Sequence, residues 1–270
     1  VEWMAAFLDK EPETRKEKAV SIAKGAGFKI QAVDINYSGR TWSILNDDTL
    51  VQPLSAIKGL GDKAIDQILA HRPFKTIDDF LFHPDIKYGK LNKKALDVLC
   101  RSGALDTLID GRFSGAKHFW SAVAVDRPRK LEKFVENIEK YEDEGDFTEF
   151  EKIEYLVGLT GMYPFYHVLK DTVAEKLAEY CVPALSEFDK DLKVAWFVPR
   201  EKIEKKTKNG KPYWILRCID PGGITSIKCW GVHPDRDKIE FNKPYMAKLD
   251  YSDDWGFSCR AIGKTFKILA

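Results

Sequence analysis

Residues 54–69 read LSAIKGLGDKAIDQIL, and this stretch decides the fold of the region around it. Two glycines, Gly59 and Gly61, bracket the apolar residue Leu60, and apolar side chains recur on both sides at helical spacing. The pattern predicts a helix-hairpin-helix in which Leu54 and Ile57 face inward from the first helix. The inward stripe of the second helix is then Ala64, Ile65, Ile68 and Leu69.

The turn of this hairpin has the composition of a phosphate-binding site. Glycine lacks a Cβ, so a phosphate can approach the backbone closely. Gly61 is expected to begin the second helix, where free N–H groups and the helix dipole favour an anion. We therefore predict DNA binding, without base reading, by Lys58, Gly59, Leu60, Gly61 and Lys63. The alternative is a plain turn between two well-packed helices.

Composition changes after about residue 190, where the chain becomes rich in Val, Ile, Trp, Tyr and Phe. Five short runs, DLKVAWFV, YWILRCI, ITSIKCWG, PYMAKLDY and GFSCRAI, are separated by turn signals and predict strands. The insert GVHPDRDKIEF (residues 231–241) is expected to form a short helix between the third and fourth strands. Five strands with such an insert favour a small closed barrel of the OB type. The predicted fold class is α+β, with a mostly helical N-terminal part.

The first predicted hairpin of this barrel is strongly basic. Residues 193–217 contain eight Lys or Arg against two Glu, which gives +6 in a chain of net charge +1. Strand alternation requires one of two adjacent aromatic residues, Tyr213 and Trp214, to face outward. Basic loops with aromatic rings are typical of single-stranded DNA sites, although a solvated hairpin with core aromatics is the alternative. The candidate residues are Lys202, Lys205, Lys206, Lys208, Lys211, Tyr213, Trp214 and Trp230.

Several longer stretches resemble one protein family, the C-family replicative DNA polymerases, which include bacterial DNA polymerase III alpha subunits and phage relatives. Residues 54–81 and 90–108 match the family's hairpin stretches in order and spacing, and residues 90–108 repeat the helix–Gly–helix scheme around Gly103. VEWMAAFLDKE (1–11), AVDINYSG (32–39) and EKIEYLVGLTGMYPF (151–165) resemble family segments on either side. The resemblance covers nearly the whole chain. It implies that this chain corresponds to the C-terminal portion of such a polymerase.

This resemblance implies four segments with different roles. Residues 1–50 correspond to the end of the fingers region, and 51–111 to a tandem helix-hairpin-helix module that holds duplex DNA. Residues 112–189 form a helical linker, and 190–270 an OB fold near the single-stranded template. The implied function is the DNA-binding part of a replicative polymerase. A freestanding, non-catalytic DNA-binding or scaffold protein is the alternative, and a repair nuclease module is a third, weaker one.

Catalytic residues are not evident in the sequence. Polymerase chemistry needs paired aspartates that hold two Mg²⁺ ions, and no strand carries a D-x-D pattern. Asp78-Asp79 and Asp253-Asp254 are adjacent pairs that suit helix caps or turns, and the five histidines lack ligand spacing. We expect no catalysis and no cofactor in this segment, whereas the family implies Mg²⁺ for the whole polymerase. The family also implies a sliding clamp as a partner, but the motif for it is not evident, because residues 112–157 contain no Gln.

Length and composition limit the remaining classes. The chain has 270 residues, of which 44% are hydrophobic and 31% charged, typical of globular proteins with more than one domain. Its five cysteines lack C-x-x-C spacing, which favours reduced thiols and a cytoplasmic location. The sequence contains no membrane-span pattern, so no membrane partner is expected. Because it opens at Val1 directly in a helical pattern, we expect it to be part of a longer chain.

Overall fold

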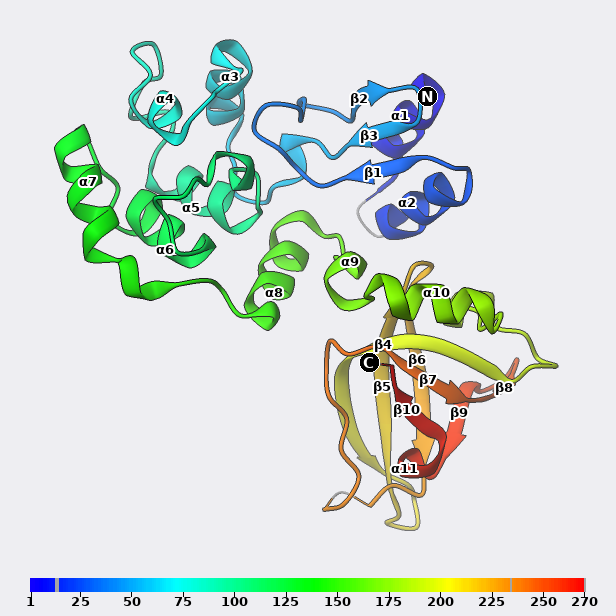
Figure 1. The fold of residues 1–270 in the computed structure, drawn as a ribbon. Helices are drawn as coiled ribbons and strands as arrows, with labels where there is room; N and C mark the ends of the chain where they lie inside the picture. Colours follow the sequence, from blue (N-terminus) through cyan, green and yellow to red (C-terminus); the bar gives the residue numbers. More distant parts are fainter. Residues whose placement is uncertain (13–14, 234, 270) are drawn as a thin grey trace. The chain divides into compact units, whose positions relative to one another are not determined.

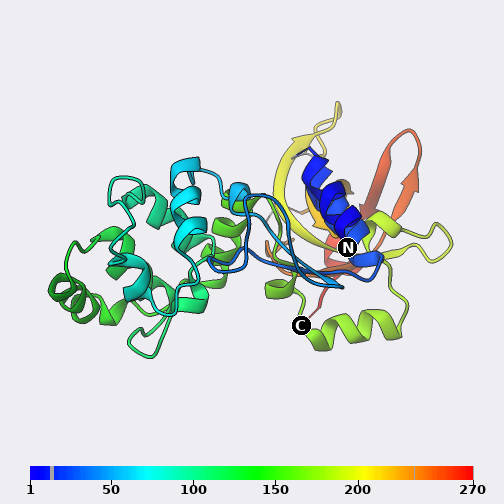
Figure 2. The same cartoon turned by 90° about the horizontal axis from the view of Figure 1, so that it is seen from above.

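The computed structural model describes residues 1–12, 15–233 and 235–269 and confirms the α+β class. The chain divides into two compact units, Val1–Tyr163 and Pro164–Ala270. The first unit is mostly helical and the second is dominated by a curled sheet (Figure 1; Figure 2 gives the view from above). No helix in the described ranges is long and apolar enough to cross a bilayer. The four finer segments expected from the sequence remain a prediction.

The N-terminal part of the first unit is a small sheet with two helices. Its helices are α1 (Glu2–Lys10) and α2 (Lys16–Gly25), and its strands are β1 (Lys29–Gln31), β2 (Ser43–Asn46) and β3 (Thr49–Val51). Strand β3 lies in the middle, parallel to β1 and antiparallel to β2. Buried Met4, Leu8, Val20 and Leu50 join the helices to the sheet. Helix α2 ends at Gly25.

The rest of the first unit is a cluster of short helices. They are α3 (Asp62–His71), α4 (Ile77–Leu81), α5 (Lys93–Arg101), α6 (Ala116–Trp120), α7 (Leu131–Lys140) and α8 (Glu149–Thr160). Three 3₁₀ helices, Leu54–Ala56, Asp106–Leu108 and Glu142–Glu144, and a π-helical stretch, Ser121–Val125, complete it. Side-chain caps fix several starts: Thr76 and Thr148 form capping boxes, and Asn92 accepts a hydrogen bond from the N–H of Ala95.

One apolar core holds these helices together. Leu54, Ile57, Ile65 and Ile68 are buried in it, as the hairpin pattern predicts, together with Leu96 and Leu99 of α5. Full burial of one such side chain contributes about 1.5–3 kcal/mol. The second half of the tandem module is shorter than expected. Gly103 has a φ of +75° and ends the α5 arm, but only the 3₁₀ helix Asp106–Leu108 follows it.

The second unit begins with helices and then forms the curled sheet. Its helices are α9 (Phe165–Val168), α10 (Asp171–Glu179) and α11 (Ile262–Thr265), with a 3₁₀ helix Leu185–Glu187. Its strands are β4 (Val194–Lys206), β5 (Pro212–Asp220), β6 (Gly223–Trp230), β7 (Tyr245–Lys248), β8 (Asp250–Ser252), β9 (Gly256–Arg260) and β10 (Phe266–Ile268). The sheet order is β10-β7-β4-β5-β6-β9-β8.

The two ends of this sheet are linked by one bent segment. Strands β7 and β8 are separated only by Leu249, yet β7 pairs with β4 whereas β8 pairs with β9. The N–H of Leu249 donates to the carbonyl of Lys193 at 2.8 Å, so pairing with the β4 side continues to the bend. The chain therefore joins β8, at one edge of the curled sheet, to β7, which lies next to the other edge strand β10. Trp214, Leu216 and Leu249 fill the interior of the sheet.

Two details differ from the expectation for this unit. The five expected strands are present, but the sheet of the described residues has seven, because one expected strand divides at Leu249 and β10 adds an edge. The expected helix at 231–241 is wrong for the residues that can be described. His233 accepts through its carbonyl from the N–H groups of Arg236 and Asp237, which makes one turn, and an irregular segment follows.

Candidate nucleic-acid interface

The hairpin turn has the backbone geometry that its glycines require. Gly59 has a φ of +89°, a region in which side chains with a Cβ are strained. Leu60 points inward and is buried, and Gly61 is the N-cap residue of α3 with ordinary extended angles. The first arm is a 3₁₀ helix, Leu54–Ala56, and not an α-helix. The sequence pattern thus predicts the turn and the inward stripe correctly. It predicts a longer first helix than the short 3₁₀ helix that is present.

The start of α3 presents free backbone donors. In the described chain, the N–H groups of Gly61, Asp62 and Lys63 donate no hydrogen bond, and the carbonyl of Gly61 accepts from Ala64 and Ile65. A Cβ built on Gly61 would meet nothing within 4 Å, so this point is open to a ligand. By contrast, the N–H of Lys58 already donates to the carbonyl of Leu159 at 2.8 Å. Its contribution is therefore limited to its side chain.

The charges around the turn are arranged favourably for an anion. Lys58 and Lys63 are exposed, and neither forms an ion pair among the described residues. Asp62 would oppose a phosphate, but its carboxylate lies 2.7 Å from the guanidinium of Arg40, which also pairs with Asp66. Arg40 thus offsets one of the two negative charges that Asp62 and Asp66 place on α3.

The structure adds a basic segment that the sequence analysis did not include. The Cε of Lys94 lies 3.5 Å from the position of a Cβ on Gly59, so the start of α5 borders the hairpin turn. Residues 86–95 contain four exposed lysines and no acid. None of the four forms an ion pair in the described ranges. The signal is visible in the sequence as KYGKLNKK (87–94), of which only residues 90–94 belong to the predicted second hairpin repeat. These lysines are Lys87, Lys90, Lys93 and Lys94.

Two arginines from the expected linker extend this basic segment. The guanidinium carbon of Arg127 lies 3.5 Å from the ring centroid of Tyr88, and that of Arg129 lies 4.9 Å from it. Arg127 also donates to the carbonyl of Tyr88 at 3.0 Å. Burial and, to a lesser degree, the charge of Arg129 lower the pKa of Arg127, but an arginine remains cationic. Stacking on Tyr88 thus holds two positive charges beside the lysine segment.

In the second unit, one row of outward side chains crosses four strands. The strand register pairs Lys205 with Tyr213, Tyr213 with Trp230, and Trp230 with Arg260. The rings of Tyr213 and Trp230 stack at 4.6 Å with planes 26° apart. Lys205 and Arg260 at the two ends are exposed. We call these four residues the outer row. Arg260 was missed, although its position next to buried Cys259 indicates an outward side chain by alternation.

Trp214 is corrected from a candidate DNA contact to a core residue. Its side chain is 1% exposed and packs inside the curled sheet, so its ring cannot stack on a base. Strand alternation sends Tyr213 outward instead. Lys202 lies on the Trp214 side, with its ammonium 4.4 Å from the Trp214 ring centroid and 2.8 Å from Glu204. Its charge is therefore partly neutralised.

The remaining basic candidates surround a tight turn between β4 and β5. Lys205, Lys206, Lys208 and Lys211 are exposed and form no ion pair among the described residues. The turn is closed by hydrogen bonds from the N–H of Thr207 to the carbonyl of Lys211 and from the N–H of Gly210 to the carbonyl of Thr207. The loop is therefore a defined turn that carries exposed lysine side chains.

The segment considered for a clamp contact is mostly occupied by internal packing. Phe147 is buried, with its ring centroid 5.7 Å from that of Trp120 and 5.2 Å from that of Tyr155. Phe150 is exposed at the start of α8. Only one of the two phenylalanines is therefore accessible for a partner.

Comparison with known proteins gives the relationship of the chain. Residues 27–115 match a family described as a helix-hairpin-helix motif, which includes the whole turn. The DNA polymerase III subunit alpha of Thermus aquaticus is 30% identical over 250 residues, covering 86% of this chain and 20% of that protein. The chain is homologous to the C-terminal portion of DNA polymerase III alpha subunits. The alpha subunits of Vibrio cholerae and Aquifex aeolicus are 26% and 27% identical and cover 97% and 94% of the chain.

This homology concerns a limited part of each alpha subunit. The chain spans 25% of the Vibrio cholerae protein and 22% of the Aquifex aeolicus protein. Among solved structures, the p204 HINb domain matches 35% of the chain at 11% identity with a TM-score of 0.25, too weak a likeness to support an argument. The alpha-subunit relatives therefore define the relationship, and the geometry above defines the candidate contacts.

Proposed function

We propose that this chain is the DNA-holding part of a replicative DNA polymerase. The observation that carries the proposal is the open turn of the hairpin. Free N–H groups at the start of α3 lie between Lys58 and Lys63, within a chain homologous to DNA polymerase III alpha subunits. Backbone donors at a helix N-terminus bind phosphates without reading bases. Such a grip suits an enzyme that must hold every sequence it copies.

The duplex contact extends from the hairpin along the neighbouring basic segment. Lys94 borders Gly59. The same basic segment contains Tyr88, and the guanidinium groups of Arg127 and Arg129 stack on its ring. These cations have no acidic partner among the described residues. Neutralising phosphates releases counterions from DNA, which makes such a surface favourable and salt-dependent.

We infer that the second unit is an OB fold that binds single-stranded template. Strands β4, β5 and β6 form a meander, β9 adds parallel to β6, and the β7–β8 segment returns to β4. This pairing order supports a five-stranded OB barrel with β10 added. OB folds bind oligonucleotides on the face of their second and third strands and nearby loops. The outer row lies on that face, and its two rings are candidates for base stacking.

The first test is duplex binding as a function of salt. We expect sequence-independent binding of a labelled duplex, with log Kobs against log salt falling by about 0.9 for each phosphate neutralised. Lys63→Ala and Lys94→Ala should each reduce the steepness of that slope by about 1. Fluorescence anisotropy at several salt concentrations, on two unrelated duplexes, measures both. An affinity that does not change with salt would contradict the proposed grip.

The second test separates single-strand from duplex binding. Replacing Lys205, Lys206 and Lys208 by alanine removes unpaired charge from the β4–β5 turn and the end of the outer row. We expect a larger loss of affinity for a labelled single strand than for a duplex at the same ionic strength, because these lysines belong to the unit that carries the stacking rings and not to the unit that carries the hairpin. A control variant replaces Lys190, Lys243 and Lys248 in the same unit. Equal losses on both ligands would remove the single-strand role.

A further inference from the structure

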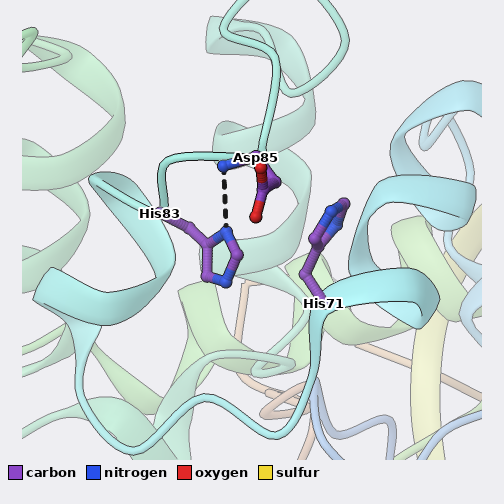
Figure 3. Close-up of side chains that lie close together, drawn as sticks. All are labelled: His71, His83 and Asp85. Atoms are coloured by element: carbon purple, nitrogen blue, oxygen red, sulfur yellow. Dashed lines mark hydrogen bonds between the residues drawn. The ribbon is translucent and has the colours of Figure 1, made fainter.

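Two histidines and an aspartate come together at the far end of α3 from the hairpin turn. His71 is the last residue of α3, and His83 and Asp85 follow α4 on the segment that leads to α5. Atoms able to bind a metal, one from each residue, all lie within 4.8 Å of one another. Figure 3 shows the Asp85 carboxylate directed into the space between the two rings. No ligand spacing is visible in the sequence, because the α4 segment separates the two histidines.

The hydrogen bonds of the rings leave one unprotonated nitrogen on each. The Nδ1 of His71 lies 2.8 Å from the carbonyl oxygen of Gln67, which can only accept, so Nδ1 carries the proton and Nε2 the lone pair. A second ring nitrogen bonded to a backbone carbonyl is the usual support of a metal-binding histidine. The Nδ1 of His83 accepts from the N–H of Asp85 at 3.3 Å and is therefore unprotonated. Its lone pair binds a metal only when this long hydrogen bond is given up.

The carboxylate of Asp85 is available, whereas the other acids nearby are occupied. Asp85 is exposed, and no cation pairs with it among the described residues. Asp78 pairs with Arg112, and Asp79 forms the capping box of α4. A hollow of about 580 Å³, lined in part by His71 and His83, borders the cluster and leaves room for water. Asp85 is therefore the acid that can complete the set.

We propose that His71, His83 and Asp85 bind a divalent transition-metal ion of the Zn²⁺ class, with water in the fourth position. Imidazole nitrogens select Zn²⁺, Co²⁺, Ni²⁺ or Cu²⁺ over Mg²⁺ and Ca²⁺, which prefer oxygen ligands. Bonds of about 2.0–2.2 Å draw the three atoms together by rotation of partly exposed side chains. The ion ties the end of α3 to the segment before α5. It thereby fixes the two elements whose other ends carry Gly61 and Lys94.

Titration of the purified chain with Co²⁺ tests this site without DNA, so its outcome is independent of the proposed function. Four-coordinate Co²⁺ has a visible ligand-field absorption, which we expect to saturate at one ion per chain. His71→Ala and His83→Ala should abolish it. Asp85→Asn should weaken binding at least as much as the roughly 10–100-fold loss that follows removal of a second-shell partner. His233→Ala removes an exposed histidine elsewhere and should leave the spectrum unchanged.

Thermal melting provides the second readout. Zn²⁺ bound only to the folded chain raises the melting temperature, and we expect this rise for the wild type and His233→Ala but not for His71→Ala. Melting without metal shows whether each variant folds. The proposal is overturned if the wild-type spectrum in Co²⁺ matches that of a His71→Ala/His83→Ala double variant. It is also overturned if Mg²⁺ at equal concentration displaces the Co²⁺.

Discussion

Replacing Trp214 by alanine is expected to lower the free energy of unfolding of the second unit by about 3–5 kcal/mol, the range for large aromatic residues removed from a core. The Trp214 ring is 1% exposed and contacts the interior of the curled sheet, so its removal leaves a cavity that neighbouring strands cannot close. A loss of this size is a large fraction of the roughly 5–15 kcal/mol by which native proteins are stable. Circular dichroism during thermal and urea unfolding measures it.

A phenylalanine at the same position provides the matched control. The Nε1 of Trp214 is buried and has no hydrogen-bond partner. Trp214→Phe removes this unpaired donor while it keeps most of the apolar ring, so the two effects oppose each other. We expect a clearly smaller loss than for alanine. If alanine and phenylalanine were equally mild, Trp214 would not be a core residue, and its earlier assignment to DNA binding would have to be reconsidered.

Two further tryptophans separate folding from binding in the same experiment. Trp230 stacks on Tyr213 in the outer row, so Trp230→Ala should weaken single-strand binding by the roughly 1–3 kcal/mol of one stacked base. Trp255 is 69% exposed, but Asp253 and Asp254 precede it and would repel a phosphate backbone. Trp255→Ala should therefore change neither stability nor DNA affinity appreciably. The three variants together test whether Trp214 is a core residue, whether Trp230 stacks on a base, and whether Trp255 contributes to neither folding nor binding.

The sequence was sufficient wherever one local pattern determines the structure. The Gly59–Gly61 spacing and the apolar stripe predict the hairpin turn, and Leu54, Ile57 and Ile68 are buried as expected. Alternation also limits the choice at Tyr213 and Trp214 to one outward ring. It cannot say which, because both residues are aromatic and the face that becomes interior is set by the curl of the whole sheet.

Features that depend on distant segments were not predictable. Lys94 borders Gly59 only because α5 packs on the hairpin, and Arg127 reaches Tyr88 from what looked like a solvated linker. The meeting of His71 and His83 likewise depends on the path of the α4 segment. The bend at Leu249 divides one predicted strand into two, of which the first pairs with β4 and the second with β9. Strand propensity does not predict such a change of partner. Each case requires tertiary packing.

Substitutions at the two hairpin glycines are expected to differ in their main effect: the change at Gly59 lowers stability, and the change at Gly61 lowers DNA affinity. At Gly59 the φ of +89° strains any residue with a Cβ, at a cost of about 1–2 kcal/mol. The added atom would also contact Lys94 and Val98 at 3.5 and 3.6 Å, which is ordinary packing. Gly59→Ala should therefore reduce stability and affect DNA binding mainly through the turn.

Gly61 provides the cleaner probe of phosphate binding. Its φ of −77° and ψ of 151° suit any residue, and a Cβ there meets nothing within 4 Å in the free protein. A phosphate bound to the N–H groups of Gly61, Asp62 and Lys63 would approach this open space. Gly61→Ala should therefore weaken duplex binding markedly, whereas its cost to folding is limited to a poorer N-cap, typically below about 1 kcal/mol.

Serine at Gly61 separates these two effects. Serine is a preferred N-cap residue, so Gly61→Ser should restore or exceed the wild-type melting temperature. Its side chain still occupies the space in front of the N–H groups. Its hydroxyl oxygen can accept a hydrogen bond from one of these groups in place of a phosphate oxygen. Duplex affinity should consequently stay low although the helix is well capped. Anisotropy titrations and melting curves of the wild type, Gly61→Ala and Gly61→Ser decide the matter. If affinity followed stability through the three proteins, the turn would be structural only, and the lysines of α5 would remain the supported duplex contact.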